Sequence, residues 1–303
     1  MDLRQLNALD AVAEHGTFSA AAAALHTVQS NVSTHVARLE KELGATLFDR
    51  AAGTLTAEGR AVVGRARRIQ AELDALVADV TALSSEVRGS LRLGVLGTTG
   101  RWLVPKLLVR MNRKHPAVSI TVVEASSATL EPQLVSGRLD LSIVTLPMPG
   151  LDLVATPLFE EDLVLIVPAA SPFASRTEVA VADLDGLEML LPAKGTVFRQ
   201  TLDEAFATAG IHPVVRAELD GVRLLASLAF EGWAAGIVPA SAIPSWLSGP
   251  WARLRVVGLP RRSIGLAQRA RSLPSAPAKA TAAVLAEVVW QDAVDLPGIH
   301  PVV

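Results

Sequence analysis

Residues 17–50 constrain the fold of this chain more than any other segment, because they read as two short helices joined by a tight connection. The first helix has an alanine-rich body that can pack closely against a neighbour, and Ser19 is predicted to cap it. Thr27 is predicted to cap the second helix and Gly44 to end it. Apolar residues recur in the second helix at steps of three and four positions, which predicts a buried face made by Val32, Val36, Leu39 and Leu43.

The other face of the second helix carries short polar side chains near its N-terminal end, beginning with Gln29. Such side chains suit entry into the major groove of DNA, where a glutamine can make two hydrogen bonds to adenine. An ordinary helical hairpin is the alternative, but the polar N-terminal face favours DNA reading. The residues predicted to contact DNA are Ser19, Gln29, Ser30, Ser33, Thr34, His35, Arg38 and Arg50.

This segment resembles the N-terminal winged helix-turn-helix of LysR-type transcriptional regulators. The resemblance rests on LRQL at 3–6, GTFSAAA at 16–22, QSNVS at 29–33, LEKELG at 39–44, LFDR at 47–50 and LTAEG at 55–59. It implies a sequence-specific regulator that binds double-stranded promoter DNA and a small-molecule effector. It also implies homodimers and homotetramers, and it adds RNA polymerase to the candidate partners.

Two positions depart from the family pattern. Thr27-Val28 stands where the family usually has a small hydroxyl residue directly before the glutamine, so we expect the cap one residue earlier. The wing at residues 51–54 is shorter than usual and lacks an extra basic residue. We therefore expect weak wing contacts that depend on Arg50 alone.

Composition excludes several kinds of chemistry. The chain has no cysteine, which excludes disulfides, thiol redox sensing and thiolate metal sites. Its six histidines show no metal-ligand spacing, and neither a metal nor a cofactor is expected. Cations and anions nearly balance across residues 1–68, so one copy alone is expected to bind DNA weakly and two copies are needed side by side.

The N-terminal residues predict a helix start rather than a targeting segment. Asp2 and Gln5 have the spacing of a capping box, with no charged-then-apolar leader before them. The longest apolar runs, such as residues 163–167 followed by Pro168, are strand-sized and too short to span a bilayer. The predicted location is cytoplasmic, with no membrane partner.

Residues 59–84 read as one long helix. Its apolar residues follow a heptad pattern of four and three positions, namely Val62, Ala66, Ile69, Leu73, Leu76, Val80 and Leu83. Charged flanks leave only a narrow apolar seam, which suits pairing with an identical helix. Packing on its own domain is the alternative, but homodimerisation through this linker helix is favoured and agrees with the family resemblance.

From Ser90 the pattern alternates short strands with helices, which predicts an α/β domain with mainly parallel strands. Two successive series indicate two subdomains with a cleft between them, and the resemblance implies an effector domain like type 2 periplasmic binding proteins. The predicted fold is therefore α/β with an N-terminal all-α winged helix-turn-helix. The predicted boundaries are 1–58 for the DNA-binding domain (helix-turn-helix about 18–37), 59–88 for the linker, 89–161 with 265–303 for subdomain 1, and 162–264 for subdomain 2.

Ligands of open α/β sheets bind beyond the carboxyl ends of the strands, where amides of helix N-termini point outward. The loops at these places predict the effector contacts Thr98, Thr99, Arg101, Ser126, Ser127, Thr145, Thr196, Phe198, Arg199 and Trp233. An anionic effector would take its donors from the hydroxyls and Arg199. Simpler alternatives stay open: Thr98 and Ser126 as helix caps, Arg199 as a solvated surface charge, and Trp233 as packing.

An enzyme is the competing class, because a cleft in an α/β domain can host catalysis. No Gly-x-Ser-x-Gly, P-loop or Gly-x-Gly-x-x-Gly motif occurs in the sequence. A solute-binding protein for transport would not need the N-terminal 60 residues. The sequence favours a DNA-binding transcription regulator that responds to a small molecule.

Overall fold

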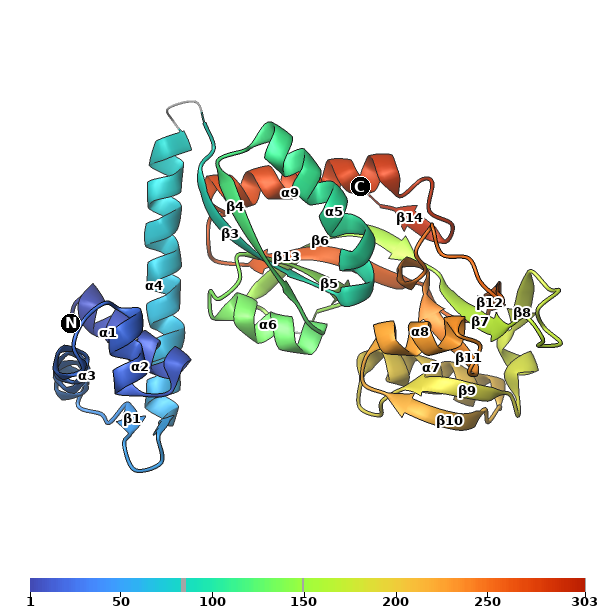
Figure 1. The fold of residues 1–303 in the computed structure, drawn as a ribbon, viewed down its shortest axis with the longest axis horizontal. Helices are drawn as coiled ribbons and strands as arrows, with labels where there is room; N and C mark the ends of the chain where they lie inside the picture. Colours follow the sequence, from blue (N-terminus) through green and yellow to red (C-terminus); the bar gives the residue numbers. More distant parts are fainter. Residues whose placement is uncertain (83–85, 149, 303) are drawn as a thin grey trace.

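The computed structural model describes residues 1–82, 86–148 and 150–302, and three regions follow one another along the chain (Figure 1). A small helical domain lies at one end, a long helix stands beside it, and two α/β lobes occupy the other end. Within the described part of the chain, no helix is both long and apolar enough to cross a membrane.

Three helices and a two-stranded wing form the N-terminal domain, namely α1 (Leu3–His15), α2 (Phe18–Ala24), α3 (Gln29–Leu43), β1 (Phe48–Asp49) and β2 (Thr54–Leu55). The predicted capping box of Asp2 and Gln5 is confirmed, as is the end of α3 at Gly44 in a left-handed conformation. Val32 and Val36 are fully buried, so they fix which face of α3 turns outward.

Three local predictions for this domain are wrong. Thr17 rather than Ser19 caps α2, because its Oγ1 accepts a hydrogen bond from the N–H of Ala20. Val28 precedes α3 and has no side-chain oxygen, while Thr27 accepts from the side-chain amide of Asn31 instead. Leu43 is 43% exposed, because it occupies the last position of the helix, beyond the buried residues.

The linker helix α4 spans Ala57–Ala82, so it begins two residues before the predicted start. Thr56 Oγ1 accepts a hydrogen bond from the N–H of Gly59, which has no partner within the first turn of the helix. Gly59 is required there, because a Cβ atom would lie 1.9 Å from the carbonyl oxygen of Leu47. The end of the predicted helix at residues 83–84, including seam residue Leu83, lies outside the described residues.

The two halves of α4 differ in burial. Val63 and Ala66 belong to the apolar core of the DNA-binding domain. Farther along, Leu76, Val77 and Val80 each keep at least 60% of their surface exposed. The second half therefore carries an apolar surface that the described part of the chain leaves exposed.

Subdomain 1 contains a six-stranded sheet of order β14-β6-β13-β5-β3-β4. Its strands are β3 (Gly89–Val95), β4 (Val118–Glu124), β5 (Leu141–Leu146), β6 (Leu153–Glu161), β13 (Arg262–Arg269) and β14 (Ile299–Pro301). Its helices are α5 (Gly97–Lys114), α6 (Ser127–Val135) and α9 (Ala276–Asp292). Strands β3, β4 and β5 are parallel, whereas β13 pairs antiparallel with both β5 and β6.

Subdomain 2 contains a second sheet of order β10-β9-β11-β7-β12-β8. Its strands are β7 (Leu163–Pro168), β8 (Glu178–Ala180), β9 (Glu188–Pro192), β10 (Val214–Leu219), β11 (Ala235–Pro239) and β12 (Trp251–Val257). The helices are α7 (Val197–Ala209) and α8 (Val222–Phe230), with short 3-10 helices η1 (Val181–Leu184) and η2 (Ala240–Ala242). The prediction of mainly parallel strands is wrong for subdomain 1, where three of the five pairings between described strands are antiparallel. In subdomain 2 three of the five pairings are parallel, and the two antiparallel ones are those of β7 with β11 and β12.

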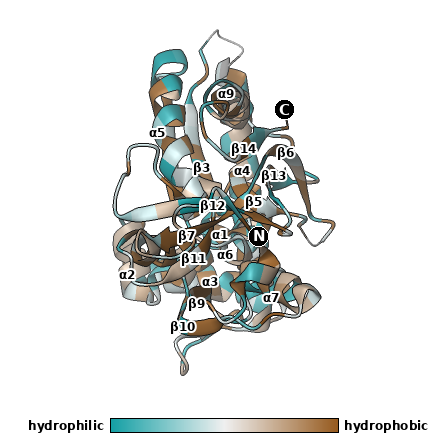
Figure 2. Ribbon diagram, turned by 90° about the vertical axis from the view of Figure 1, so that its right-hand side faces the viewer, coloured by the Kyte–Doolittle hydropathy of each residue, from teal (hydrophilic) through white to brown (hydrophobic). Residues whose placement is uncertain are grey.

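The chain crosses between the subdomains at Asp162 and again between β12 and β13. The first crossing agrees with the prediction, but β13 begins at Arg262, three residues before the predicted boundary at 265. Each lobe has its own apolar core around its central strands. Figure 2 shows these strands as hydrophobic segments inside the lobes, while the outer end of α5 is hydrophilic.

Candidate DNA-binding surface and effector cleft

The N-terminal half of α3 presents a polar surface to solvent. Gln29, Ser30 and Thr34 are exposed, and Ser33 is half-buried. Thr34 Oγ1 donates a hydrogen bond to the carbonyl oxygen of Ser30, whereas the Gln29 side chain has no hydrogen-bond partner among the described residues. The Gln29 amide is therefore free to bond to a base edge.

Arg50 follows β1 and reaches back to α3. Its Nη2 donates a hydrogen bond to Ser33 Oγ at 3.2 Å, and its guanidinium carbon lies 4.9 Å from the ring centroid of Phe18. The wing cation is thus held between α2 and the face of α3 that was predicted to read bases. This position suits a contact with phosphate beside the groove.

The other predicted DNA contacts differ in exposure. Ser19 and Arg38 are exposed, but His35 is half-buried. His35 stands three residues after Val32 and four before Leu39, which places it toward the buried side of α3. His35 is therefore less accessible than Gln29, Ser30 and Thr34, which are exposed.

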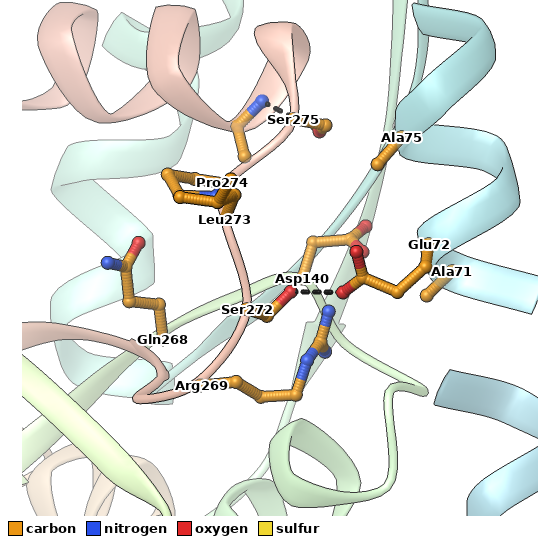
Figure 3. A pocket seen from close by; sticks show the side chains of 11 residues that line it. Ala71, Glu72, Ala75, Asp140, Gln268, Arg269, Ser272, Leu273, Pro274 and Ser275 are labelled. Atoms are coloured by element: carbon orange, nitrogen blue, oxygen red, sulfur yellow. Dashed lines mark hydrogen bonds between the residues drawn. The ribbon is translucent and has the colours of Figure 1, made fainter. Parts of the chain in front are cut away.

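The linker helix is fastened to subdomain 1 where the loop before α9 passes it (Figure 3). Ser272 Oγ donates a hydrogen bond to Glu72 Oε1, and the N–H of Ala276 donates to Asp79 Oδ1 at 2.9 Å. A cavity of about 30 Å³ beside these contacts is lined by Asp140 and Arg269, among others. This is far smaller than the roughly 300–1,000 Å³ of a typical small-molecule site, so it is not a candidate for the effector site.

A larger groove of about 610 Å³ opens between α4 and α6. Arg60 and Arg68 line it from α4, and Glu131 lines it from α6. Burial raises the pKa of Glu131. Because both signs of charge face this groove, its lining does not favour an anion or a cation.

Two of the predicted effector residues lie in the first turn of α5. The helix begins at Gly97, so Thr98 and Thr99 are helical rather than part of the predicted loop. Both are buried, at 4% and 0% exposure. Thr99 Oγ1 has no hydrogen-bond partner in the described part of the chain. Arg101 is half-exposed one turn further along.

The next two strand ends bring three further predicted residues together. The N–H of Thr145, in β5, donates a hydrogen bond to Ser127 Oγ at 3.1 Å. Ser126 is exposed, and its Oγ lies 3.1 Å from Thr129 Oγ1. Thr98 lies inside the first turn of α5, so the capping alternative is wrong for Thr98. Ser126 does occupy the N-cap position of α6, although its side chain makes no capping hydrogen bond.

Thr98 is also tied to the place where the chain crosses between the subdomains. Arg262 Nη2 donates to Thr98 Oγ1 at 3.0 Å and to Glu161 Oε1 at 2.6 Å. Glu161 is fully buried, and its other oxygen accepts a hydrogen bond from the N–H of Ser241 in subdomain 2. Sequence reasoning missed this ion pair, because 101 positions separate its partners.

In subdomain 2, the start of α7 is used for internal packing. Thr196 caps the helix, and Phe198 packs on the core of the sheet. Arg199 is 6% exposed and donates hydrogen bonds to Asp203, to Glu218 and to the carbonyl oxygen of Pro192.

Arg199 is therefore neither a solvated surface charge nor a free donor for an effector. Burial alone would lower the pKa of Arg199, but the hydrogen bonds with Asp203 and Glu218 raise it overall. The hydrogen bond from Arg199 in turn lowers the pKa of the Glu218 carboxyl. Neither prediction for Arg199 is correct, because folding brings the carboxylates of Asp203 and Glu218 to its guanidinium.

Trp233 was predicted to contact the effector, but it lies away from the contact between the subdomains. It follows the C-terminal end of α8, whereas Arg223 in the first turn of α8 contacts subdomain 1. Nine helical residues separate the two ends by about 13 Å. Trp233 is 48% exposed and stacks under the guanidinium of Arg216 at 5.2 Å, which contradicts a place in the cleft.

Comparisons with known proteins agree with this architecture. The model of the bacterial regulatory helix-turn-helix protein, lysR family, matches residues 3–60, and that of the LysR substrate binding domain matches residues 84–290. A probable hydrogen peroxide-inducible genes activator of Streptomyces viridosporus is 33% identical, over 95% of this chain and 94% of that protein. The dual regulator OxyR of Escherichia coli is 29% identical, over 95% of each chain.

Two solved structures are similar along nearly the whole chain. A full-length OxyR variant from Pseudomonas aeruginosa has a TM-score of 0.76 at 25% identity, covering 96% of this chain and 95% of that one. CbnR complexed with its target DNA has a TM-score of 0.67 at 27% identity, covering 96% and 99%.

A helix-turn-helix with an exposed polar α3, joined to a two-lobed sensor domain, defines a DNA-binding transcription regulator with an effector-binding domain rather than an enzyme. The chain belongs to the LysR family of such regulators.

Proposed function

We propose that α3 reads promoter DNA in the major groove. Gln29 makes the base-specific contact, and Ser30, Ser33 and Thr34 touch base edges or phosphates beside it. Ser19, Arg38 and Arg50 neutralise or bond to phosphate, with His35 at the margin of the surface. The observation that carries the proposal is the exposed polar N-terminal half of α3 above a buried apolar face. The likeness to CbnR complexed with target DNA supports it.

We infer that two copies pair through α4. The exposed apolar side chains Leu76, Val77 and Val80 support pairing, because a second copy would remove them from water. A pair also supplies two α3 helices for two half-sites, as the near balance of charge in one DNA-binding domain requires. We propose that two such pairs form a tetramer through further contacts between effector domains. We also propose that the protein contacts RNA polymerase at the promoter and that it is located in the cytoplasm.

We propose that the effector is a small molecule held non-covalently between the subdomains. Several relatives are named as hydrogen peroxide-inducible activators, but this chain has no cysteine, so no thiol here can be oxidised. The side chains proposed to bind the effector are therefore mainly serine and threonine hydroxyls. The proposed contacts are Thr98, Thr99, Arg101, Ser126, Ser127, Thr145 and Thr196.

We propose domain boundaries that coincide with the observed helices and strands. The DNA-binding domain comprises residues 1–56, the linker is α4, and the effector-binding domain begins at β3. Effector binding changes the arrangement of paired copies only if the effector has different affinities for the two states.

The test of DNA reading compares the full chain with its Gln29→Ala variant on a library of duplexes at fixed salt. We expect the wild type to select one operator and the variant to lose about 1–3 kcal/mol of discrimination at one base pair. Equal discrimination by both proteins would remove Gln29 from the proposal. A thermal-stability screen of the wild type against small metabolites identifies the effector, because a ligand of the native state raises the unfolding temperature.

A further inference from the structure

An ion pair joins the two subdomains away from the chain crossings. Arg223 Nη1, from the first turn of α8, donates to both carboxylate oxygens of Glu124 at 2.7 Å. Glu124 ends β4 in subdomain 1, and 99 positions separate the partners. The two side chains are 48% and 49% exposed.

The pair lies directly over the start of α5. A Cβ atom added to Gly97 would lie 2.6 Å from Glu124 Oε1 and 2.8 Å from Arg223 Cδ. Thr98 and Thr99, two of the proposed effector contacts, follow Gly97 immediately. The ion pair therefore lies at the proposed effector cleft, and Gly97 leaves room for it.

The two ion pairs near the border between the subdomains differ in burial, and of the two only the pair of Glu124 and Arg223 has one partner in each subdomain. The pair of Glu161 and Arg262 is buried at the chain crossing, where breaking it would leave a buried charge without a partner. The pair of Glu124 and Arg223 is half-exposed, so water and salt compete with it. The first suits a hinge that stays assembled, and the second suits a contact that opens and closes.

We propose that the Glu124–Arg223 ion pair is a latch that holds the subdomains together over the effector cleft. Effector binding acts by changing the ratio of latched to open molecules. The proposal rests on the proposed function only for the identity of the cleft. The latch itself is a property of the two subdomains, and no effector is needed to observe it.

The absence of cysteine permits a direct distance measurement. Val109 on α5 and Val214 on β10 are 71% and 50% exposed, one in each subdomain. We would replace both with cysteine, attach spin labels, and dilute the labelled full chain with unlabelled wild type so that one pair is measured per assembly. Electron–electron distance spectra then give the fraction of open molecules.

Glu124→Gln and Arg223→Gln are each expected to raise the ratio of open to latched molecules about 1.5- to fivefold, as an exposed ion pair allows. Reversing the charges with Glu124→Arg and Arg223→Glu together is expected to restore the wild-type distances. Glu188→Gln is the matched control, since Glu188 and Arg216 form an equally exposed pair within subdomain 2. Salt should open the wild type and leave Arg223→Gln unchanged.

Distances identical to the wild type in both single variants would overturn the latch, as would equal opening by Glu188→Gln. These outcomes are independent of promoter binding. A protein that fails to select DNA but shows the expected distances refutes the proposed DNA reading and leaves the latch standing.

Discussion

Arg50 Nη2 donates a hydrogen bond to Ser33 Oγ at 3.2 Å, so the base of the wing is joined directly to the recognition helix. The wing has no other cation between β1 and β2. Arg50 therefore orients the wing while offering its remaining N–H groups to a phosphate.

Arg50→Ala is expected to weaken binding about equally for all DNA sequences, because phosphate contacts carry no sequence information. The slope of log affinity against log salt should fall by about 1 per DNA-binding domain. Fluorescence anisotropy at four salt concentrations measures both quantities. A loss confined to one operator sequence would instead assign base reading to Arg50.

Leu76→Asp combined with Val80→Asp is expected to separate paired copies. Burying each of these side chains contributes roughly 1.5–3 kcal/mol, and a carboxylate cannot enter an apolar seam unpaired. Sedimentation equilibrium measures the mass, with Arg65→Gln on the exposed flank of α4 as control. An unchanged mass for the double variant contradicts pairing through α4.

Glu161→Ala is expected to lower the free energy of unfolding of the effector domain by about 3–5 kcal/mol, because Arg262 would be left 12% exposed without its partner. Urea denaturation followed by tryptophan fluorescence measures this loss. Replacing the exposed Glu178 by Ala serves as the control and should change stability by less than about 0.5 kcal/mol. A comparable loss from both replacements would show that the pair has no special role.

Asp140 beside α4 gives a pH-dependent prediction. Burial raises the pKa of its carboxyl above the ordinary 3.8, against a smaller opposing effect of the hydrogen bond from the Arg92 N–H. The folded state thus binds the proton more tightly than the unfolded state, and stability falls as pH rises from 3.8 through the raised value. Asp140→Asn should therefore be more stable than wild type at pH 7.

The advantage of Asp140→Asn should vanish below pH 3.8, where both states of the wild type are protonated. Thermal unfolding at a series of pH values measures the difference. A constant difference at every pH would show that the change acts through packing rather than through charge.

Predictions from the sequence were best where the cause is local. The capping box at Asp2 and the first crossing at Asp162 follow from short patterns of apolar and polar residues. The caps at Ser19 and Thr27 were wrong by one or two positions, because hydroxyl residues adjoin one another and the backbone decides which one accepts.

The sequence by itself determined the helix-turn-helix with its polar α3 face, the linker helix, the two α/β series and the absence of thiol chemistry, because each depends on residues close in the chain or on composition. Only the tertiary structure decided that Arg199 is buried between Asp203 and Glu218, that Trp233 lies at the far end of α8, and that Glu161 meets Arg262. The direction and burial of these side chains depend on which strands become neighbours, and one sequence read in order does not contain that information.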